Sequence, residues 1–178
     1  MTTFICIASG PSLTRADCEL AMNSGYPVIA VNSSWQLIPE CHYLFAADCS
    51  WWDKYKGTLT TRAERWTVSG RAHLRYGVNL FSPPDSDSFN SGQRAIQLAV
   101  HLGAERIILL GYDCSLDSGT HWHGNHPEGL KNPRAESIRR WQGEFQRLAD
   151  SLKSVSIINC SRHTALNCFP RIRPEDLL

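Results

Sequence analysis

Short apolar runs alternate with amphipathic segments along the whole chain. The runs are rich in β-branched and aromatic residues and are apolar on both faces, which is typical of strands buried in a parallel sheet. The intervals between them are long enough for helices. We expect strands at 4–8, 27–31, 42–47, 65–68, 78–81, 107–110 and 155–159.

Two intervals have clear helical periodicity. In the first, Ser91 is the expected N-cap, an apolar stripe follows, and Gly103 ends the helix. In the second, from about 135 to 152, apolar residues recur at spacings of three and four. Strands that alternate with helices predict an α/β fold, a single Rossmann-like domain over residues 1–178 with a mostly parallel sheet and helices on both faces.

Polar residues follow several strands directly. Asp113 comes just after the strand at 107–110, and the loop beyond it holds His121, His123 and His126. In open α/β sheets, ligands bind at the carboxyl ends of the strands. Because imidazole exchanges protons near neutral pH, this loop is the expected place of acid–base chemistry. One or more of the three imidazoles, His123 foremost, could instead only tie the loop to backbone carbonyls.

The first two strands also end in candidate binding residues. Gly10, Pro11 and Ser12 lie in a turn between the first strand and a helix, where free N–H groups can hold an anion. Asn32 follows the second strand, where its amide could contact a base or a ribose. A plain strand-to-helix turn and an Asx turn are the structural alternatives for these two sites.

The sequence suggests two alternative metal sites. Asp48 and Asp113 at separate strand ends would suit Mg²⁺ with a di- or triphosphate, although Asp48 could equally cap a helix. The three loop histidines, with Cys114, offer nitrogen and sulfur ligands for Zn²⁺. The histidine spacing matches no closed zinc motif, so zinc ranks below nucleotide chemistry.

Composition narrows the class of protein. The 178 residues have a formal net charge of +1, which gives no signal for nucleic acid or a charged membrane surface. Seven cysteines without a regular spacing predict reduced thiols in a cytoplasmic protein. No apolar stretch is long enough to span a bilayer.

Six tryptophans suggest pocket walls, with one of Trp51 and Trp52 in this role, and a Trp-rich surface that forms a homodimer. The Pro- and Asp-rich loop 83–88 is a candidate lid.

Taken in order, these motifs resemble the sialyltransferase-like group of Rossmann folds. The resemblance is carried by Gly10-Pro11-Ser12-Leu13, by Asn32, by Ser91-Gly92 and by Leu109-Leu110-Gly111-Tyr112-Asp113. The group includes the bacterial sialyltransferases of glycosyltransferase family 42 and the archaeal-type 6-hydroxymethylpterin diphosphokinase (MptE-like) domains. Small proteins with this pattern resemble ones encoded by phages and prophages, which would place this chain in the host cytoplasm.

The resemblance implies a role for each matched residue. Gly10, Pro11 and Ser12 would contact the nucleotide phosphate, Asn32 would contact the nucleotide, and so would Ser91 and Gly92. The catalytic histidine of the group matches His126 best and His121 second, with Asp113 beside it. The chain lacks the lid and acceptor elements of the longer sialyltransferases, and no clear pair of tyrosines follows Asp113.

The implied function is a nucleotide-dependent transferase, foremost a glycosyltransferase with a nucleotide-sugar donor, a histidine base and a small-molecule or glycan acceptor. Three alternatives stay open at this point. They are an Mg²⁺-dependent diphosphokinase acting on a small hydroxymethyl substrate, a non-catalytic nucleotide-binding module, and a zinc metallohydrolase using His121, His123 and His126.

Overall fold

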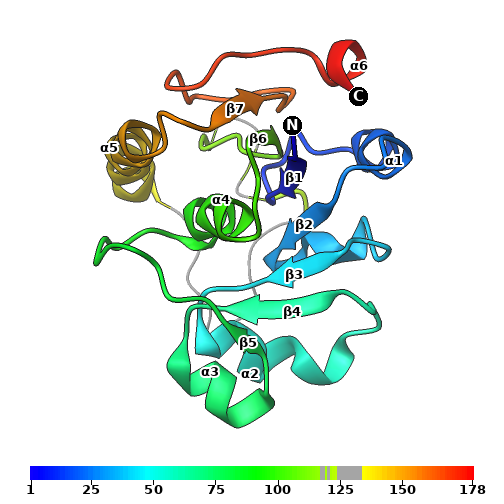
Figure 1. Cartoon of the computed structure of the whole chain (residues 1–178), viewed down its shortest axis with the longest axis vertical. Coiled ribbons are helices and arrows are strands. Elements are labelled where there is room, and N and C mark those ends of the chain that lie inside the picture. Colours follow the sequence, from blue (N-terminus) through cyan, green and yellow to red (C-terminus); the bar gives the residue numbers. More distant parts are fainter. Residues whose placement is uncertain (117–118, 120, 124–133) are drawn as a thin grey trace.

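One sheet of seven strands organises the chain (Figure 1). The computed structural model describes residues 1–116, 119, 121–123 and 134–178. Every strand pairing within them is parallel, and the strand order is β5-β4-β3-β2-β1-β6-β7. The expected strands are confirmed to within a few residues as β1 (Thr3–Ile7), β2 (Val28–Val31), β3 (Tyr43–Phe45), β4 (Glu64–Thr67), β5 (Asn79–Leu80), β6 (Arg106–Leu110) and β7 (Ser156–Asn159).

Helices cover both faces of this sheet. Two of them, α4 (Ser91–His101) and α5 (Ala135–Ser151), lie on one face, and α1 (Arg15–Asn23) lies on the other (Figure 1). The face of α1 also carries η1 (Asn32–Gln36), α2 (Cys49–Tyr55), η2 (Lys56–Thr58), α3 (Gly70–Tyr76) and α6 (Pro174–Leu177). The predicted Rossmann-like α/β class is therefore confirmed.

The central strands β1 and β6 lie side by side and are buried on both faces. Their register pairs Ile5 with Ile108 and Ile7 with Leu110, and all four side chains are at most 1% exposed. Two cores result, one on each face, because alternate residues of a strand point to opposite sides. Since the two strands end at the same level, the turns that follow them are held next to each other.

The helix α4 begins as expected, but its cap is one residue earlier than predicted. Asn90, not Ser91, is the N-cap: its side chain accepts a hydrogen bond from the N–H of Gln93, and the Gln93 side chain accepts one from the N–H of Asn90. This reciprocal pair is a capping box. Ser91 is freed for another contact, since its Oγ accepts from the N–H of Ala47 at 3.1 Å, just after β3.

The loop 83–88 is fastened to α4 and α5 in this structure, and its role as a lid stays a prediction. Arg94, whose side chain is 7% exposed, binds Asp85 at 2.9 Å and the carbonyl of Asp87. Asp85 also accepts from Gln97, Ser88 donates to Glu144, and Asp87 pairs with Arg147. Opening this loop would leave a buried guanidinium unpaired, a penalty of about 3 kcal/mol or more.

Three of the six tryptophans are interior residues. Trp35, Trp51 and Trp52 are at most 7% exposed, so neither member of the adjacent pair lines an open pocket. Trp66, Trp122 and Trp141 are half-buried. Three tryptophans thus fill the cores and three remain partly exposed, and the homodimer stays a prediction.

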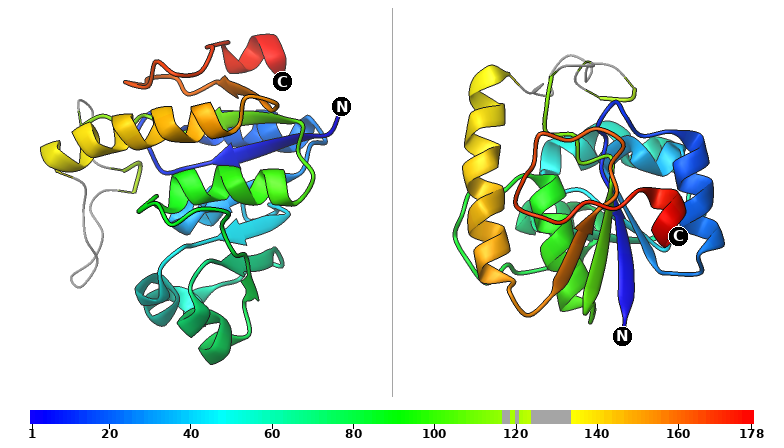
Figure 2. Two further views of the ribbon diagram at one scale, coloured as in Figure 1. Left: turned by 60° about the vertical axis from the view of Figure 1, so that its left-hand side comes forward. Right: turned by 90° about the horizontal axis from the view of Figure 1, so that it is seen from above.

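The segment after β7 crosses the sheet to α6, which packs beside α1 (Figure 2). It was expected to be irregular, and most of it is. No disulfide joins the seven cysteines. None of the described helices combines the length and apolar character needed to cross a bilayer.

Candidate functional site

The turn from Gly10 to Leu13 uses all of its backbone N–H groups within the protein. Gly10 donates to the carbonyl of Gly111 at 2.7 Å, and Leu13 donates to the carbonyl of Gly10. Ser12 donates from its N–H to Asp113 Oδ2 at 2.9 Å and from its hydroxyl to Oδ1 at 2.7 Å. Pro11 has no N–H. In this conformation the turn has no amide left for the phosphate that the sequence placed on Gly10, Pro11 and Ser12.

The Asp113 carboxylate thus takes the place expected for a bound anion. Gly10 permits this approach, since a Cβ there would lie 2.2 Å from Asp113 Oδ1. Gly111 has a φ of 72°, and a Cβ there would lie 2.7 Å from the carbonyl oxygen of Ala8. Burial raises the pKa of Asp113, and the bonds from Ser12 and the charge of His163 lower it in part. Asp113 is 1% exposed, so it holds the turn from beneath.

The described part of the histidine loop docks on the ends of β1 and β2. His121 Nδ1 and Ser9 Oγ form a hydrogen bond of 2.8 Å. Trp122 donates from its N–H to the carbonyl of Ser9 and from its indole to Ser34 Oγ. The His123 ring stacks on the His121 ring with centroids 4.9 Å apart. One imidazole of the predicted catalytic loop is therefore fixed beside the first strand end, whereas His126 lies outside the described residues.

Asn32 stands at the end of β2 in a conformation that non-glycine residues rarely adopt. Its φ is 53°, in the left-handed region, and it begins the short helix η1. The position before it, Val31, is the N-cap and has no side-chain cap bond. The Asn32 side chain makes no hydrogen bond to any described residue, so the Asx-turn alternative is not what is observed. Strained residues of this kind cluster at functional sites, and the amide is available to a ligand.

The start of α4 lies at the same edge of the sheet. The hydroxyl of Ser91 holds β3 through Ala47, and the carbonyl of Gly92 accepts from the Tyr112 hydroxyl at 2.9 Å. The N–H groups of Ser91 and Gly92 donate to no residue in the described part of the chain. They are the first two orphan donors of a helix that is long enough to have a dipole.

The two carboxylates predicted for a metal do not form a shared site. Asp48 is exposed, lies just after β3 and makes no cap bond, whereas Asp113 follows β6, which is three strand positions away. Three strand spacings amount to roughly 14 Å. Both oxygens of Asp113 are already bonded to Ser12. These two residues therefore do not fit a single Mg²⁺, and we derive no chemistry through one.

The zinc alternative also lacks support in the described residues. No group of three or more His, Cys, Asp and Glu side chains there could hold a metal ion. Burial raises the pKa of Cys114 strongly, which opposes the thiolate that zinc requires. Because His126 is outside the described residues, the full set of three histidines stays a prediction.

Two residues at this edge were missed by sequence reasoning as site residues. Ser9 stands in the sequence among the polar residues at the converging strand ends, but it was not assigned a role. His163 had no such signal, because it lies in the segment that was expected to be irregular. Its backbone N–H donates to Ser12 Oγ at 3.3 Å, and its charge acts on Asp113.

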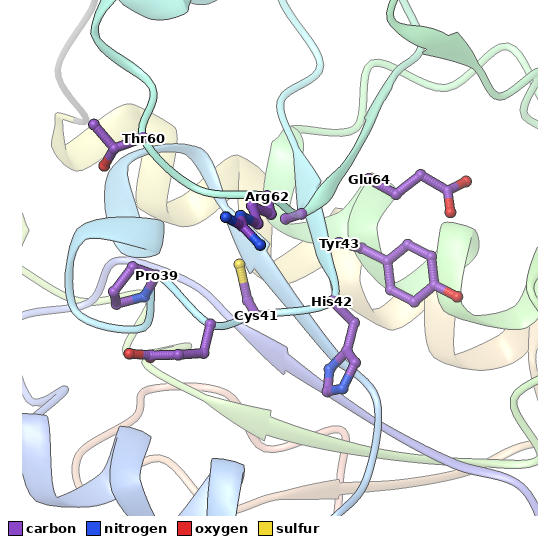
Figure 3. A pocket seen from close by; sticks show the side chains of 9 residues that line it. Pro39, Cys41, His42, Tyr43, Thr60, Arg62 and Glu64 are labelled. Atoms are coloured by element: carbon purple, nitrogen blue, oxygen red, sulfur yellow. The ribbon is translucent and has the colours of Figure 1, made fainter.

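A hollow of about 490 Å³ opens at the opposite edge, at the amino ends of β3 and β4 (Figure 3). Its side chains do not converge: Arg62 and Cys41 point toward one another, whereas Glu64 and His42 point away. Burial raises the pKa of Cys41 to about 11, so the thiol is protonated. His42 is held by the backbone, since its Nδ1 accepts from the N–H of Val28. The hollow therefore brings no set of side chains together for chemistry.

Neither a protein-family model nor a curated protein matches this sequence. Among solved structures, the MAf glycosyltransferase from Magnetospirillum magneticum AMB-1 superposes with a TM-score of 0.71 at 10% sequence identity. The match covers 99% of this chain and 34% of that chain, so this chain spans about a third of the larger protein. Identity at this level shows the fold alone. The chain is similar in fold to part of a glycosyltransferase.

Proposed function

We propose that this chain is a glycosyltransferase that moves a sugar from a nucleotide-sugar donor to a hydroxyl of a small-molecule or glycan acceptor. The observation that carries the proposal is the docking of His121 on Ser9 at the carboxyl edge of the sheet. An acid–base group held at a ligand-binding edge, in a fold that a glycosyltransferase shares, is what this reaction needs.

The nucleotide would lie across the ends of β1 and β2. Asn32 would contact the base or ribose through an amide that has no other use in the described structure. Ser91 and Gly92 would add their unpaired N–H groups at the start of α4. The turn of Gly10, Pro11 and Ser12 would not bind the nucleotide itself. It would position the Asp113 carboxylate beneath the nucleotide.

The reaction needs one proton to be removed. The acceptor hydroxyl would lose its proton to an imidazole as its oxygen bonds to the anomeric carbon, while the bond from that carbon to the donor phosphate breaks and its electron pair stays on the phosphate oxygen. His126 is the first candidate for this base and His121 the second. Imidazole suits the role because it is partly neutral near pH 7.

The donor can be identified by a panel of CMP, CDP, UDP, GDP, ATP and ADP-ribose in a thermal-shift assay, each with and without Mg²⁺, with Zn²⁺ and EDTA added as separate arms. Stabilisation by a cytidine or uridine nucleotide without metal supports glycosyl transfer. Stabilisation by ATP only with Mg²⁺ supports diphosphate transfer instead. If EDTA alone destabilises the protein and no nucleotide has an effect, a metallohydrolase replaces the proposal.

Turnover of the nucleotide-sugar matched to that nucleotide then tests the base. His126→Ala and His121→Ala are compared with His101→Ala, whose exposed imidazole lies at the far end of α4 beside Phe81. We expect one of the first two to slow turnover by at least about 100-fold with little loss of nucleotide affinity. Binding without turnover in the parent protein would indicate a non-catalytic module.

A further inference from the structure

The hydroxyl of Ser34 joins three segments at the carboxyl edge of the sheet. Ser34 lies on η1, directly after β2, and its side chain is fully buried. Its Oγ donates to the carbonyl of Ala8, which follows β1, at 2.8 Å. The same oxygen accepts from the indole N–H of Trp122 in the histidine loop at 3.2 Å. One buried side chain therefore connects the ends of two neighbouring strands with that loop.

Chemistry fixes the direction of these two hydrogen bonds. An indole N–H can only donate and a carbonyl can only accept, so the Ser34 hydroxyl gives its one proton to Ala8 and accepts from Trp122. Alanine in place of Ser34 would remove both bonds at once. The indole N–H and the Ala8 carbonyl would then lose these partners beside a side chain that water does not reach, where unmade hydrogen bonds are costly.

Trp122 is held through both its backbone and its ring. Its backbone N–H donates to the carbonyl of Ser9 at 3.0 Å, and its indole reaches Ser34. The ring also packs against the core on the α1 side of the sheet. His121 precedes Trp122 in the chain, and its Nδ1 lies 2.8 Å from Ser9 Oγ. A rotation of Trp122 away from η1 would therefore shift the His121 imidazole off Ser9.

The neighbouring Ser33 is a buried serine that lacks this contact. It lies on the same short helix and is 5% exposed. Burial raises the pKa of Tyr55 on α2, and the Ser33 hydroxyl beside it lowers that pKa in part. Within the described residues, Ser34 bonds to the histidine loop and Ser33 does not. Ser33 therefore supplies a matched control for the role of Ser34.

We propose that Ser34 is a positioning residue, which holds His121 at the carboxyl edge of the sheet through the indole of Trp122. The inference rests on the proposed function and deepens it, because it assigns the groups that keep one candidate base in place. A general base must lie within hydrogen-bond reach of the proton that it removes, and a displacement of about 1 Å can cost on the order of 100-fold in rate. Asn32 lies on the same helix as Ser34. The proposed nucleotide contact and the support of the base thus share one short element.

The indole N–H of Trp122 allows a direct measurement of the contact with Ser34. The chain has six tryptophans, so their indole signals can be resolved in a two-dimensional NMR spectrum, and Trp122→Phe assigns one of them by removing it. We expect Ser34→Ala to shift this signal and to speed its hydrogen exchange by about tenfold, the factor that one lost hydrogen bond supplies. Ser33→Ala should change neither. An unchanged Trp122 signal in Ser34→Ala would overturn the inference.

Turnover separates a positioning residue from one that only stabilises the fold. Trp122→Phe removes the indole N–H, retains an aromatic ring and leaves the bond from Ser34 to Ala8 in place. We expect it to lower kcat by about tenfold and to leave nucleotide affinity unchanged. Trp141→Phe is the same change in a half-buried tryptophan that packs against the other core, and it should alter neither quantity. Trp122→Phe with the kcat of the parent protein would contradict the role of Ser34.

A second background tests whether this support acts through His121. In His121→Ala the contact between Trp122 and Ser34 no longer holds a candidate base, so Trp122→Phe should slow turnover no further there. A further tenfold loss in that background would mean that Trp122 acts on another group, and the role assigned to Ser34 would be wrong.

The NMR and turnover measurements keep this inference apart from the proposed function. If the Trp122 signal responds to Ser34→Ala as expected and the parent protein turns over no nucleotide-sugar, the support of His121 stands and glycosyl transfer fails. If the parent protein turns over a nucleotide-sugar and Trp122→Phe matches its rate, glycosyl transfer stands and the positioning role is wrong.

Discussion

Two backbone segments at the carboxyl edge look alike in the sequence and differ in the structure. The turn Gly10–Leu13 and the start of α4 at Ser91–Gly92 both pair a glycine with a serine where a helix begins. The first spends its N–H groups on Gly111 and on Asp113, which is about a hundred residues away. The second is capped by its own neighbour Asn90 and keeps the N–H groups of Ser91 and Gly92 unpaired in the described structure.

The difference shows that a glycine turn before a helix can either hold an internal anion or leave its N–H groups unpaired. In the β1 turn, the Asp113 carboxylate accepts the hydrogen bonds that a bound anion would otherwise accept. At α4 the cap bond comes from the neighbouring Asn90. The N–H groups of Ser91 and Gly92 therefore stay unpaired within the described residues. Long-range contacts decide between the two outcomes, because local sequence supplies the same turn chemistry in both.

Alanine at the two glycines is the sharpest way to test this contrast. A Cβ on Gly10 would lie 2.2 Å from Asp113 Oδ1, whereas a Cβ on Gly92 would lie 3.3 Å from the Tyr112 ring. We expect Gly10→Ala to lower the free energy of unfolding by about 3 kcal/mol. Gly92→Ala should change it by less than about 1 kcal/mol, since helix propensity offsets the contact. Urea unfolding measures both, and equal losses would contradict the contrast.

Removal of the internal anion should have the next largest effect. Asp113→Ala leaves the Ser12 N–H and hydroxyl without their acceptor, at a cost of about 2 kcal/mol in the free energy of unfolding. The vacated turn should then accept an external anion. We expect sulfate to raise the melting temperature of Asp113→Ala more than that of the parent protein. The matched control is Asp48→Ala, an exposed carboxylate at another strand end, for which sulfate should raise the melting temperature no more than it does in the parent protein.

This contrast also marks how far the sequence could predict the structure. The strands and the long helices were found because their apolar periodicity is local, and even the cap of α4 was missed by only one residue. The bond from Ser12 to Asp113 could not be found, because it depends on the adjacency of β1 and β6. His163 was missed for the same reason: its place is set by contacts of its neighbours with Tyr112, Asn159 and Asp17.

The local cap of α4 should be worth less than the long-range contacts of the β1 turn. Asn90→Ala removes the side-chain acceptor for the N–H of Gln93. We expect a loss of about 1 kcal/mol in the free energy of unfolding, typical of an N-cap. Asn90→Ser should recover most of it, because serine is also a good cap. A loss as large as that of Gly10→Ala would mean that the two segments are equally dependent on distant contacts.

The smallest effect we predict is in the pH dependence of stability, and it comes from the buried carboxylate itself. Burial is the largest influence on Asp113 and raises its pKa above the usual value of 3.8. A carboxyl whose pKa is higher in the folded state binds more protons there, so its contribution to folding is greatest in acid and falls as the pH rises from about 3.8 through the raised folded-state pKa. The stability of the parent protein relative to Asp113→Asn should therefore decrease as the pH rises above about 4. A difference between the parent protein and Asp113→Asn that grows with pH would mean that the hydrogen bonds from Ser12 outweigh burial, and that the turn binds its internal anion more tightly than its depth in the protein implies.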